Sequence, residues 1–278
     1  MGNIRSLRKS GEKLILGGCT YTIKAVEGCG GNSIVYQAIY NDNLNKELQH
    51  EVLIKELYPY YPQGGIYRDE TGNISYVSEA EEYMQHCKMR FKQGNEINLR
   101  LLQTLPSQIS GNVNSYEAYG TYYSVLTVHG GRNLEHLLET TDSLSLRDAA
   151  KIMEKVLDAV EIFHENEMLH LDISPDNIIL LPEQAFLIDY NSAWSMSDRH
   201  NGGFSFSEKE GYSAPEIRLC DAEKISYATD IYSVCAVFYR ILTEKKLTDN
   251  EIIRNGLKSS LRANLSIFQG EPNSAVLK

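Results

Sequence analysis

The chain has 278 residues, of which 42% are hydrophobic and 23% charged, as is usual for a soluble globular protein. Its formal net charge of −10 disfavours a general nucleic-acid-binding surface. No apolar run is long enough for a membrane span, no secretory signal is present, and the five cysteines form no C-x-x-C pair. We therefore expect a cytoplasmic protein with one large domain or two lobes.

The first part of the chain predicts strands joined by a glycine-rich turn. Residues 21–26 and 33–40 alternate apolar with other side chains, as half-buried strands do. Gly28 and Gly30 lie between them, where a glycine-rich hairpin lets backbone N–H groups approach phosphates. An ordinary turn has the same composition, so this signal is weak when it stands alone.

A third strand, residues 51–55, ends in Lys55, and residues 58–73 are typical of a loop. A long helical stretch begins near residue 78 and contains Glu96 among apolar positions. Taken singly, Lys55 and Glu96 are typical solvated charges.

Residues 116–128 predict two strands around a turn at Gly120, and residues 129–132 then break the pattern, as a connection between lobes does. Ser145 is placed to cap an amphipathic helix, whose apolar residues recur at three- and four-residue steps from Ala149 to Phe163. We interpret these apolar positions as core.

A polar loop that leads into an apolar strand, residues 169–180, contains Asp172 and Asn177. A carboxylate can orient a hydroxyl and accept its proton, and an amide oxygen can hold a divalent cation. An acidic turn before a strand is the plain alternative. Asp189 ends the next apolar strand, where a carboxylate is costly unless a cation or water receives it.

These segments occur in the order of the protein-kinase landmarks. Gly28, Gly30 and Val35 match G-x-G-x-x-G-x-V, Lys55 ends a V-A-I-K-like strand, and residues 170–177 match H-R-D-x-x-x-x-N. Residues 189–191 take the place of D-F-G, and residues 214–216 match A-P-E. The chain resembles the eukaryotic-like protein kinases, in particular a bacterial serine/threonine kinase group with I-K-E-x-x-P, H-R-D-I-S-P-D-N and K-P-G-Y-A-P motifs.

The resemblance implies an α+β, bilobal fold with a small β-rich N-lobe, which has one helix, and a larger, mainly helical C-lobe. We expect an N-terminal extension over residues 1–20, the N-lobe over 21–128 and the C-lobe over 129–278. No segment after Leu242 resembles the usual late helices. The sequence therefore predicts an incomplete C-lobe, in which Glu216 lacks its usual arginine.

The resemblance also implies ATP and Mg²⁺ as cofactors and an unidentified protein as the substrate. Asp172 would act on the substrate hydroxyl, Lys55 would bind the α- and β-phosphates, and Glu96 would hold Lys55 by an ion pair. Asn177 and Asp189 would bind the metal, and Asp230 would brace the catalytic loop. The expected nucleotide-binding residues are Gly28, Gly30, Val35, Lys55, Thr127, Val128 and His129.

Several positions depart from the kinase pattern: Ser33 replaces a glycine, Leu53 an alanine, Leu171 the catalytic-loop arginine and Asn191 the D-F-G glycine. These changes leave open a pseudokinase that acts as a nucleotide-binding scaffold. A small-molecule phosphotransferase is the third alternative, although such enzymes lack the A-P-E landmark. Since Leu171 cannot receive a phosphate, we expect activity without phosphorylation between residues 189 and 216.

Overall fold

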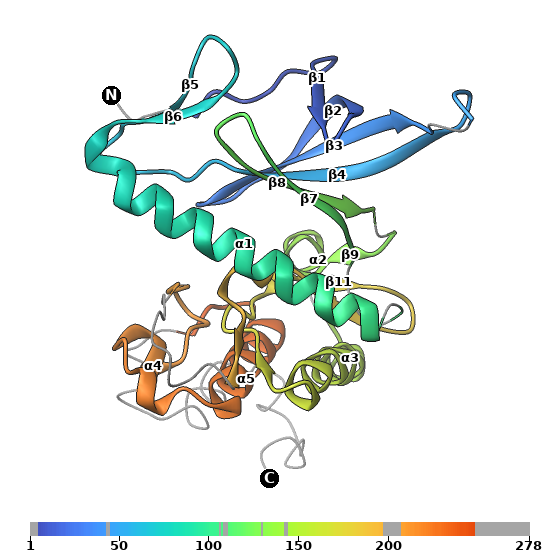
Figure 1. Ribbon diagram of the computed structural model, residues 1–278. Helices are drawn as coiled ribbons and strands as arrows, with labels where there is room; N and C mark the ends of the chain where they lie inside the picture. The colour runs from blue at the N-terminus through green and yellow to red at the C-terminus, as the bar shows by residue number, and fades with distance from the viewer. Residues whose placement is uncertain are drawn as a thin grey trace, which may run out of the picture. The chain divides into compact units, whose positions relative to one another are not determined.

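The computed structural model describes residues 5–42, 45–105, 107, 111–128, 130–141, 144–196 and 207–247. They divide into two compact units, with the boundary between His129 and Gly130, one residue after the expected boundary. The N-terminal unit is a sheet with one long helix, and the C-terminal unit is mainly helical (Figure 1). The predicted α+β, bilobal class is confirmed.

Six antiparallel strands form the main sheet of the N-terminal unit, in the order β1-β2-β3-β4-β8-β7. Side chains of a strand alternate between the two faces of a sheet, and Ile34, Tyr36 and Ile54 are fully buried on one of them. The strands are β1 (Lys13–Leu16), β2 (Cys19–Cys29), β3 (Ser33–Asn41), β4 (Gln49–Leu57), β7 (Asn112–Ala118) and β8 (Thr121–Thr127).

Residues 5–20 belong to this unit, so their interpretation as a separate extension is wrong. Strand β1 pairs with β2, with Leu14 opposite Tyr21. Leu14 and Leu16 are fully buried, and Arg8 is 5% exposed. Burial of these side chains removes apolar surface from water, whereas a separate extension would leave that surface exposed.

A short hairpin and one long helix complete the unit. Strands β5 (Ile66–Arg68) and β6 (Ile74–Tyr76) pair within and just beyond the stretch that was expected to be a loop. Asp69 closes the turn, since its side chain accepts hydrogen bonds from the amides of Thr71 and Asn73. The short 3₁₀ helix η1 (Ser78–Ala80) leads into α1 (Glu81–Thr104), which buries Met84, Cys87 and Phe91 in the core.

The C-terminal unit is organised around two helices that pack together, α3 (Leu146–Glu165) and α5 (Tyr227–Thr243). Ser145 caps α3 by accepting a hydrogen bond from the amide of Asp148, as predicted. The predicted core face of α3 is also confirmed, since Ala149, Met153, Val156, Val160 and Phe163 are buried. The other helices are α2 (Leu134–Thr140), η2 (Pro175–Asn177), η3 (Tyr190–Ser192), α4 (Pro215–Arg218) and η5 (Ala222–Lys224).

Short strands carry the loops of the C-terminal unit. Strands β9 (Arg132–Asn133), β11 (Ile178–Leu180) and β12 (Ala185–Leu187) form one sheet in the order β12-β11-β9. Strands β10 (Met168–Leu169) and β13 (Trp194–Ser195) form a second, two-stranded one. The segment 248–278, which contains the predicted degenerate C-lobe end, lies outside the described residues.

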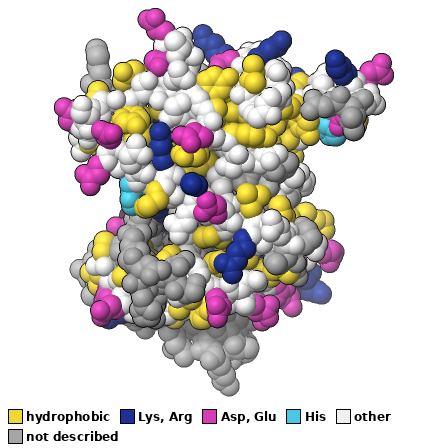
Figure 2. All heavy atoms as spheres, in the orientation of Figure 1, with side chains coloured by type: hydrophobic (Ala, Val, Ile, Leu, Met, Phe, Trp, Pro, Cys, Tyr) yellow, Lys and Arg dark blue, Asp and Glu magenta, His cyan; other side chains and the backbone are white. Residues whose placement is uncertain are grey.

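The visible surface is mixed in character. Acidic and basic side chains are interspersed among hydrophobic ones on the face that Figure 2 shows. None of the helices in the described ranges combines the length and the apolar content that a membrane crossing requires.

Candidate active site

The N-terminal half of the candidate site is a row of residues across three neighbouring strands. Gly28 of β2 lies opposite Val35 of β3, which in turn lies opposite Lys55 of β4. Lys55 then lies opposite Ser124 of β8. Directly opposite residues share one face of an antiparallel sheet. The register therefore brings together three residues that the sequence nominated separately.

Neither packing nor backbone conformation within the protein requires glycine in the β2–β3 hairpin. A Cβ on Gly28 or Gly31 would meet no atom within 4 Å, and one on Gly30 would meet only the Ser33 carbonyl at 3.7 Å. None of the three has a positive φ. Since neither packing nor backbone conformation excludes a side chain, the open space fits a ligand that approaches the backbone. This is the space that nucleotide phosphates would need.

Lys55 is 9% exposed, and its Nζ lies 5.8 Å from the centre of the Phe91 ring of α1. The predicted ion pair with Glu96 is wrong. The side chain of Glu96 is 66% exposed, and its carboxylate lies 4.0 Å from Lys92. The helix meets the sheet through Phe91 and through Asn95, whose Oδ1 accepts a hydrogen bond of 2.6 Å from Ser124.

The residues expected to bind adenine lie at and beyond the end of β8. The backbone N–H of Thr127 donates to the carbonyl of Gly111 at 3.1 Å, so this donor is already used within the unit. Val128 is 49% exposed. His129 lies outside the described residues.

The C-terminal half of the candidate site begins with Asp172 and Asn177. The Asn177 amide group donates to the backbone carbonyl of Asp172 at 2.8 Å and to its carboxylate at 3.1 Å. Both Asn177 donors point back to Asp172, so the amide oxygen is left as the acceptor on the far side of the group. Pro175 begins the 3₁₀ helix η2, which brings Asn177 back over Asp172.

His170 fixes the position of Asp172 relative to the strand that leads to Asp189. Its Nδ1 accepts the backbone N–H of Asp172 at 3.3 Å, so Nε2 carries the proton and donates to the Ile188 carbonyl at 3.1 Å. The imidazole is fully buried, and burial lowers its pKa, which keeps it neutral. Sequence reasoning gave His170 no separate role, although its place in the H-x-D motif was a signal.

The predicted brace from Asp230 is confirmed. Its carboxylate is fully buried and accepts the backbone N–H groups of His170 and Leu171, each at 2.9 Å. His164 of α3 lies 3.0 Å from the same carboxylate. Helix α5 therefore holds the catalytic loop by a buried carboxylate that contacts three nitrogen atoms.

Asp189 occupies a strained position at the start of η3, with φ +64°. Its carboxylate accepts the N–H of Asn191 at 3.3 Å. Tyr190 is buried and stacks on Phe163, with ring centres 5.2 Å apart, and its hydroxyl donates to the Leu187 carbonyl at 2.9 Å. The aromatic side chain thus anchors the strained residue to α3.

Lys209 is a residue of this half that sequence reasoning quoted only as part of a motif. Its Nζ lies 2.6 Å and 2.5 Å from the two carboxylate oxygens of Asp176, which also accepts a hydrogen bond from Ser174. The ion pair ties the segment before α4 to the catalytic loop. The H-R-D-I-S-P-D-N and K-P-G-Y-A-P motifs each contain one partner, and their co-occurrence was the available signal.

The electrostatics of the loop converge on Asp172. The pKa of this carboxyl is raised to about 7, chiefly by burial and also by the charges of Asp189 and Asp176. The charge of Lys209 and the hydrogen bond from Asn177 act in the opposite direction and lower it. A carboxyl group with such a pKa can release and accept a proton near neutral pH.

The A-P-E landmark forms the short helix α4. Pro215 begins the helix, and the Glu216 carboxylate accepts a hydrogen bond of 2.6 Å from Thr229 at the start of α5. Among the described residues, Glu216 is thus anchored by the hydroxyl group of Thr229. The segments in which an arginine partner was expected to be missing lie outside the described residues.

Comparison with known families decides the assignment of this arrangement. The family described as "Protein kinase domain" matches residues 67–276, which is more than half of the chain. The chain belongs to the protein kinase family. The match begins after the glycine-rich hairpin and Lys55, so it does not include these residues.

Curated relatives of this kinase include myosin light chain kinases. The chain is 26% identical over 186 residues to mouse "Myosin light chain kinase family member 4", covering 62% of this chain and 47% of the relative. It is 27% identical over 151 residues to chicken "Myosin light chain kinase, smooth muscle" (51% and 8%). It is 29% identical over 119 residues to zebrafish "Myosin light chain kinase 3" (42% and 16%). The chain spans less than half the length of each.

Among solved structures, the kinase is similar to "PpkA-294 apo form", with a TM-score of 0.67 and 22% sequence identity. The similarity covers 90% of this chain and 84% of that one. At this level of identity the comparison establishes the fold alone.

Proposed function

We propose that this chain is an ATP- and Mg²⁺-dependent protein kinase of the cytoplasm that phosphorylates serine and threonine hydroxyls, including hydroxyls of its own chain. The observation that carries the proposal is the Asp172–Asn177 pair, in which an amide holds a carboxylate whose pKa lies near 7. Both residues stand on a loop that His170 and Asp230 fix from two sides.

The residues present fit a magnesium ion that is shared with a nucleotide. Asn177 would offer its amide oxygen and Asp189 its carboxylate, and Mg²⁺ typically takes one or two protein oxygens together with substrate phosphates. When bound, the metal neutralises charge on the phosphates.

The reaction follows from the roles of the side chains. Asp172 would accept a hydrogen bond from the substrate hydroxyl and orient its oxygen toward the γ-phosphorus of ATP. The new oxygen–phosphorus bond forms as the bond to the β–γ bridging oxygen breaks, ADP leaves, and the hydroxyl proton passes to Asp172. Lys55 would hold the α- and β-phosphates, and the hairpin of Gly28 and Gly30 would cover them with N–H groups.

A pseudokinase scaffold is the second candidate, and one observation favours it. Glu96 is exposed and lies beside Lys92, so it does not hold Lys55 in place. The Asp172 site keeps all its parts despite this change, which is why we prefer an active enzyme. Activity as a small-molecule phosphotransferase is disfavoured, because such enzymes lack the A-P-E landmark, which in this chain begins helix α4.

Incubation of the protein with γ-labelled ATP, Mg²⁺ and a generic protein substrate tests the proposal. Wild type should transfer label to serine and threonine, and Asp172→Asn should reduce transfer by about 10²–10⁴-fold with little change in nucleotide affinity. Phosphoamino-acid analysis identifies the acceptor. ATP binding without transfer above the Asp172→Asn background would favour the scaffold instead.

A further inference from the structure

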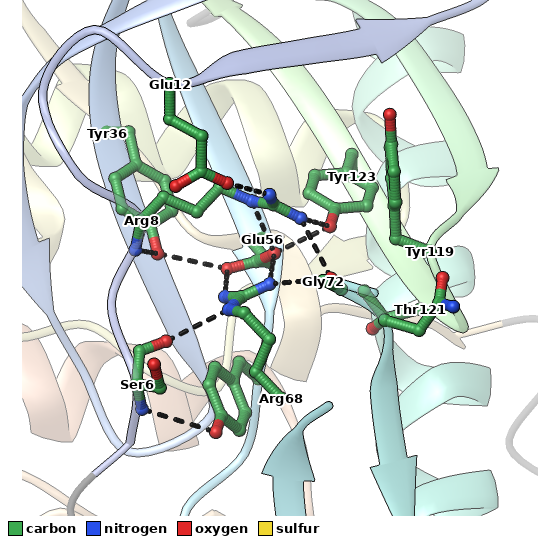
Figure 3. A network of polar contacts seen from close by, with 12 residues as sticks. Ser6, Arg8, Glu12, Tyr36, Glu56, Arg68, Gly72, Tyr119, Thr121 and Tyr123 are labelled. Carbon is green, nitrogen blue, oxygen red and sulfur yellow. Dashed lines mark hydrogen bonds and ion pairs between the residues drawn. The ribbon is translucent and has the colours of Figure 1, made fainter. Parts of the chain in front are cut away.

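Residues 5–12, here called the N-terminal strap, lie against the main sheet of the N-terminal unit (Figure 3). Arg8 anchors the strap. Its Nε donates to Glu56 at 3.2 Å and its Nη2 to the Tyr123 hydroxyl at 3.0 Å, while its backbone N–H donates to the Tyr36 hydroxyl at 3.2 Å. Glu56 is the residue that follows Lys55 in β4, so the strap is fixed to the strand that carries the candidate phosphate-binding lysine.

The anchor is a buried, charge-balanced network. Burial alone would raise the pKa of the Glu56 carboxyl, but hydrogen bonds and the charge of Arg68, together with Arg8, lower it. Arg68 donates to both carboxylate oxygens, at 3.0 Å and 2.6 Å. Glu12 adds a second carboxylate, 2.5 Å from Arg8. Because removing one member would leave a buried charge unpaired, the anchor holds the strap firmly in place.

Arg5, three residues earlier, reaches the glycine-rich hairpin. Its guanidinium donates to the Gly30 carbonyl at 2.7 Å and the Tyr58 carbonyl at 2.8 Å, and contacts the Cys29 Sγ at 3.0 Å. All these acceptors are neutral. Among the described residues no carboxylate pairs with Arg5, so no described group of opposite charge offsets its positive charge at the hairpin.

Backbone bonds also hold this hairpin, and one of them shares the Gly31 carbonyl with Arg5, whose guanidinium lies 3.4 Å from it. The Tyr60 N–H donates to the Gly31 carbonyl at 2.8 Å, and the Tyr58 N–H to the Asn32 carbonyl at 3.1 Å. The carbonyls of Gly30, Gly31 and Asn32 are therefore all engaged by residues of the N-terminal unit. The hairpin has a fixed backbone orientation.

This orientation determines where the N–H groups point. In a trans peptide the C=O and the following N–H lie on opposite sides of the chain. With the carbonyls of Gly30 and Gly31 directed toward Arg5 and Tyr60, the N–H groups of Gly31 and Asn32 point the other way. No described group accepts either N–H, and the Cβ direction of Gly31 is open. Successive unpaired N–H groups of this kind bind anions.

We propose that Arg5 is a positioning residue for the nucleotide: it holds the hairpin so that the N–H groups of Gly31 and Asn32 face the phosphates, and it adds its positive charge near that site. The inference rests on the proposed function, since it takes ATP as the ligand. It extends that function to a segment that precedes the first strand and that the family match does not include.

The test compares Arg5→Gln, Arg5→Lys and the control Lys9→Ala, all in the full chain. Lys9 is exposed in the same strap, and its side chain forms no hydrogen bond or ion pair with the described residues. Titration with ATP and Mg²⁺ by calorimetry should show about tenfold weaker binding for Arg5→Gln and an intermediate loss for Arg5→Lys, which keeps the charge but not the planar fork. Lys9→Ala should bind as wild type does. Arg5→Gln binding within twofold of wild type would overturn the proposal.

Hydrogen exchange of the nucleotide-free protein separates failure of this inference from failure of the proposed function. In Arg5→Gln the amides of Tyr58 and Tyr60 should exchange several-fold faster, because their acceptors in the hairpin become mobile. Unchanged exchange would refute the positioning role even if ATP binds. If wild type binds no ATP, the proposed function fails, and the role of Arg5 in nucleotide binding fails with it. Faster exchange in Arg5→Gln would then show only that Arg5 fixes the hairpin.

Discussion

Asp230 holds the backbone of Leu171 in a left-handed conformation. The N–H of Leu171 donates to Oδ1 of Asp230 at 2.9 Å, and its φ is +60°. For a residue with a Cβ this conformation costs about 1–2 kcal/mol. The left-handed conformation persists because the hydrogen bond to the buried carboxylate offsets this cost. The conformation also sets the direction from which the chain enters Asp172.

We therefore predict that Asp230→Asn destabilises the protein by about 2–4 kcal/mol. An asparagine has one acceptor oxygen, and its NH₂ group would face an N–H donor that the carboxylate now accepts from His170 or Leu171. Urea unfolding measures the loss. Asp158→Asn on the exposed side of α3 is the matched control and should unfold as wild type does. Equal stability of the two variants would show that the brace is unimportant.

The sequence predicted the C-terminal half of the site well, because its residues are close together along the chain. Asp172, Asn177 and His170 lie within one short loop, so their spacing along the chain brings them close enough to contact one another. The contact between Asp230 and this loop spans about sixty residues, and it was expected from the resemblance to protein kinases. Local spacing was sufficient only for the contacts within the loop.

The N-terminal half was less predictable, because it depends on rotation about a helix and on a segment without a strong pattern. Phe91, Asn95 and Asn98 follow one another at four- and three-residue steps and form the inward face of α1, whereas Glu96 lies about 100° away from Asn95. A helix with few apolar residues does not fix this phase. The strap was missed because buried arginines cannot be distinguished by sequence from the exposed arginines that are far more common.

The position of Glu96 leads to a second prediction. Glu96→Gln should leave kcat and KM for ATP within twofold of wild type, because its carboxylate is exposed beside Lys92. Lys55→Met should raise KM for ATP or lower kcat by tenfold or more if phosphoryl transfer uses this lysine. Steady-state kinetics of the two variants measure both effects. A large loss in Glu96→Gln would mean that the helix turns this residue inward during catalysis.

The third prediction concerns phosphorylation between Asp189 and Glu216. Leu171 is buried at 9% exposure and has no donor with which to bind a phosphate. Ser195 is also buried, in β13, whereas Ser197 and Ser205 lie outside the described residues. Replacing Ser197, Ser205 and Ser207 by alanine should leave the rate within about threefold. A hundredfold loss, about 2.7 kcal/mol of barrier, would contradict the prediction.

The raised pKa of Asp172 leads to a fourth prediction, on stability. This pKa is raised to about 7, chiefly by burial, so the folded protein holds the proton more tightly than the unfolded chain does. The contribution of the group to stability is full below its unfolded pKa near 4 and is lost as the pH rises toward 7. Asp172→Asn does not ionise and keeps a side-chain acceptor for Asn177.

At pH 8 without metal, Asp172→Asn should therefore be more stable than wild type by about 1–2 kcal/mol, and the difference should vanish near pH 4. Urea unfolding at both pH values measures this. A difference that is the same at pH 4 and pH 8 would show that ionisation of Asp172 is not its cause.

The last prediction concerns Lys209, which lowers the pKa of Asp172 and pairs with Asp176. Removal of its charge should raise the pKa of Asp172 further, so less of the carboxylate is ionised at neutral pH. In Lys209→Met the rise of kcat/KM with pH should move upward by about half a unit to one unit, and the rate at pH 7 should fall by about two- to fivefold. Lys209→Arg keeps the charge and should keep the midpoint near that of wild type. Lys151→Met, on the exposed side of α3, controls for the loss of one positive charge elsewhere in the unit. A lower rate in Lys209→Met with an unchanged pH midpoint would mean that Lys209 acts only by tying the segment before α4 to the catalytic loop.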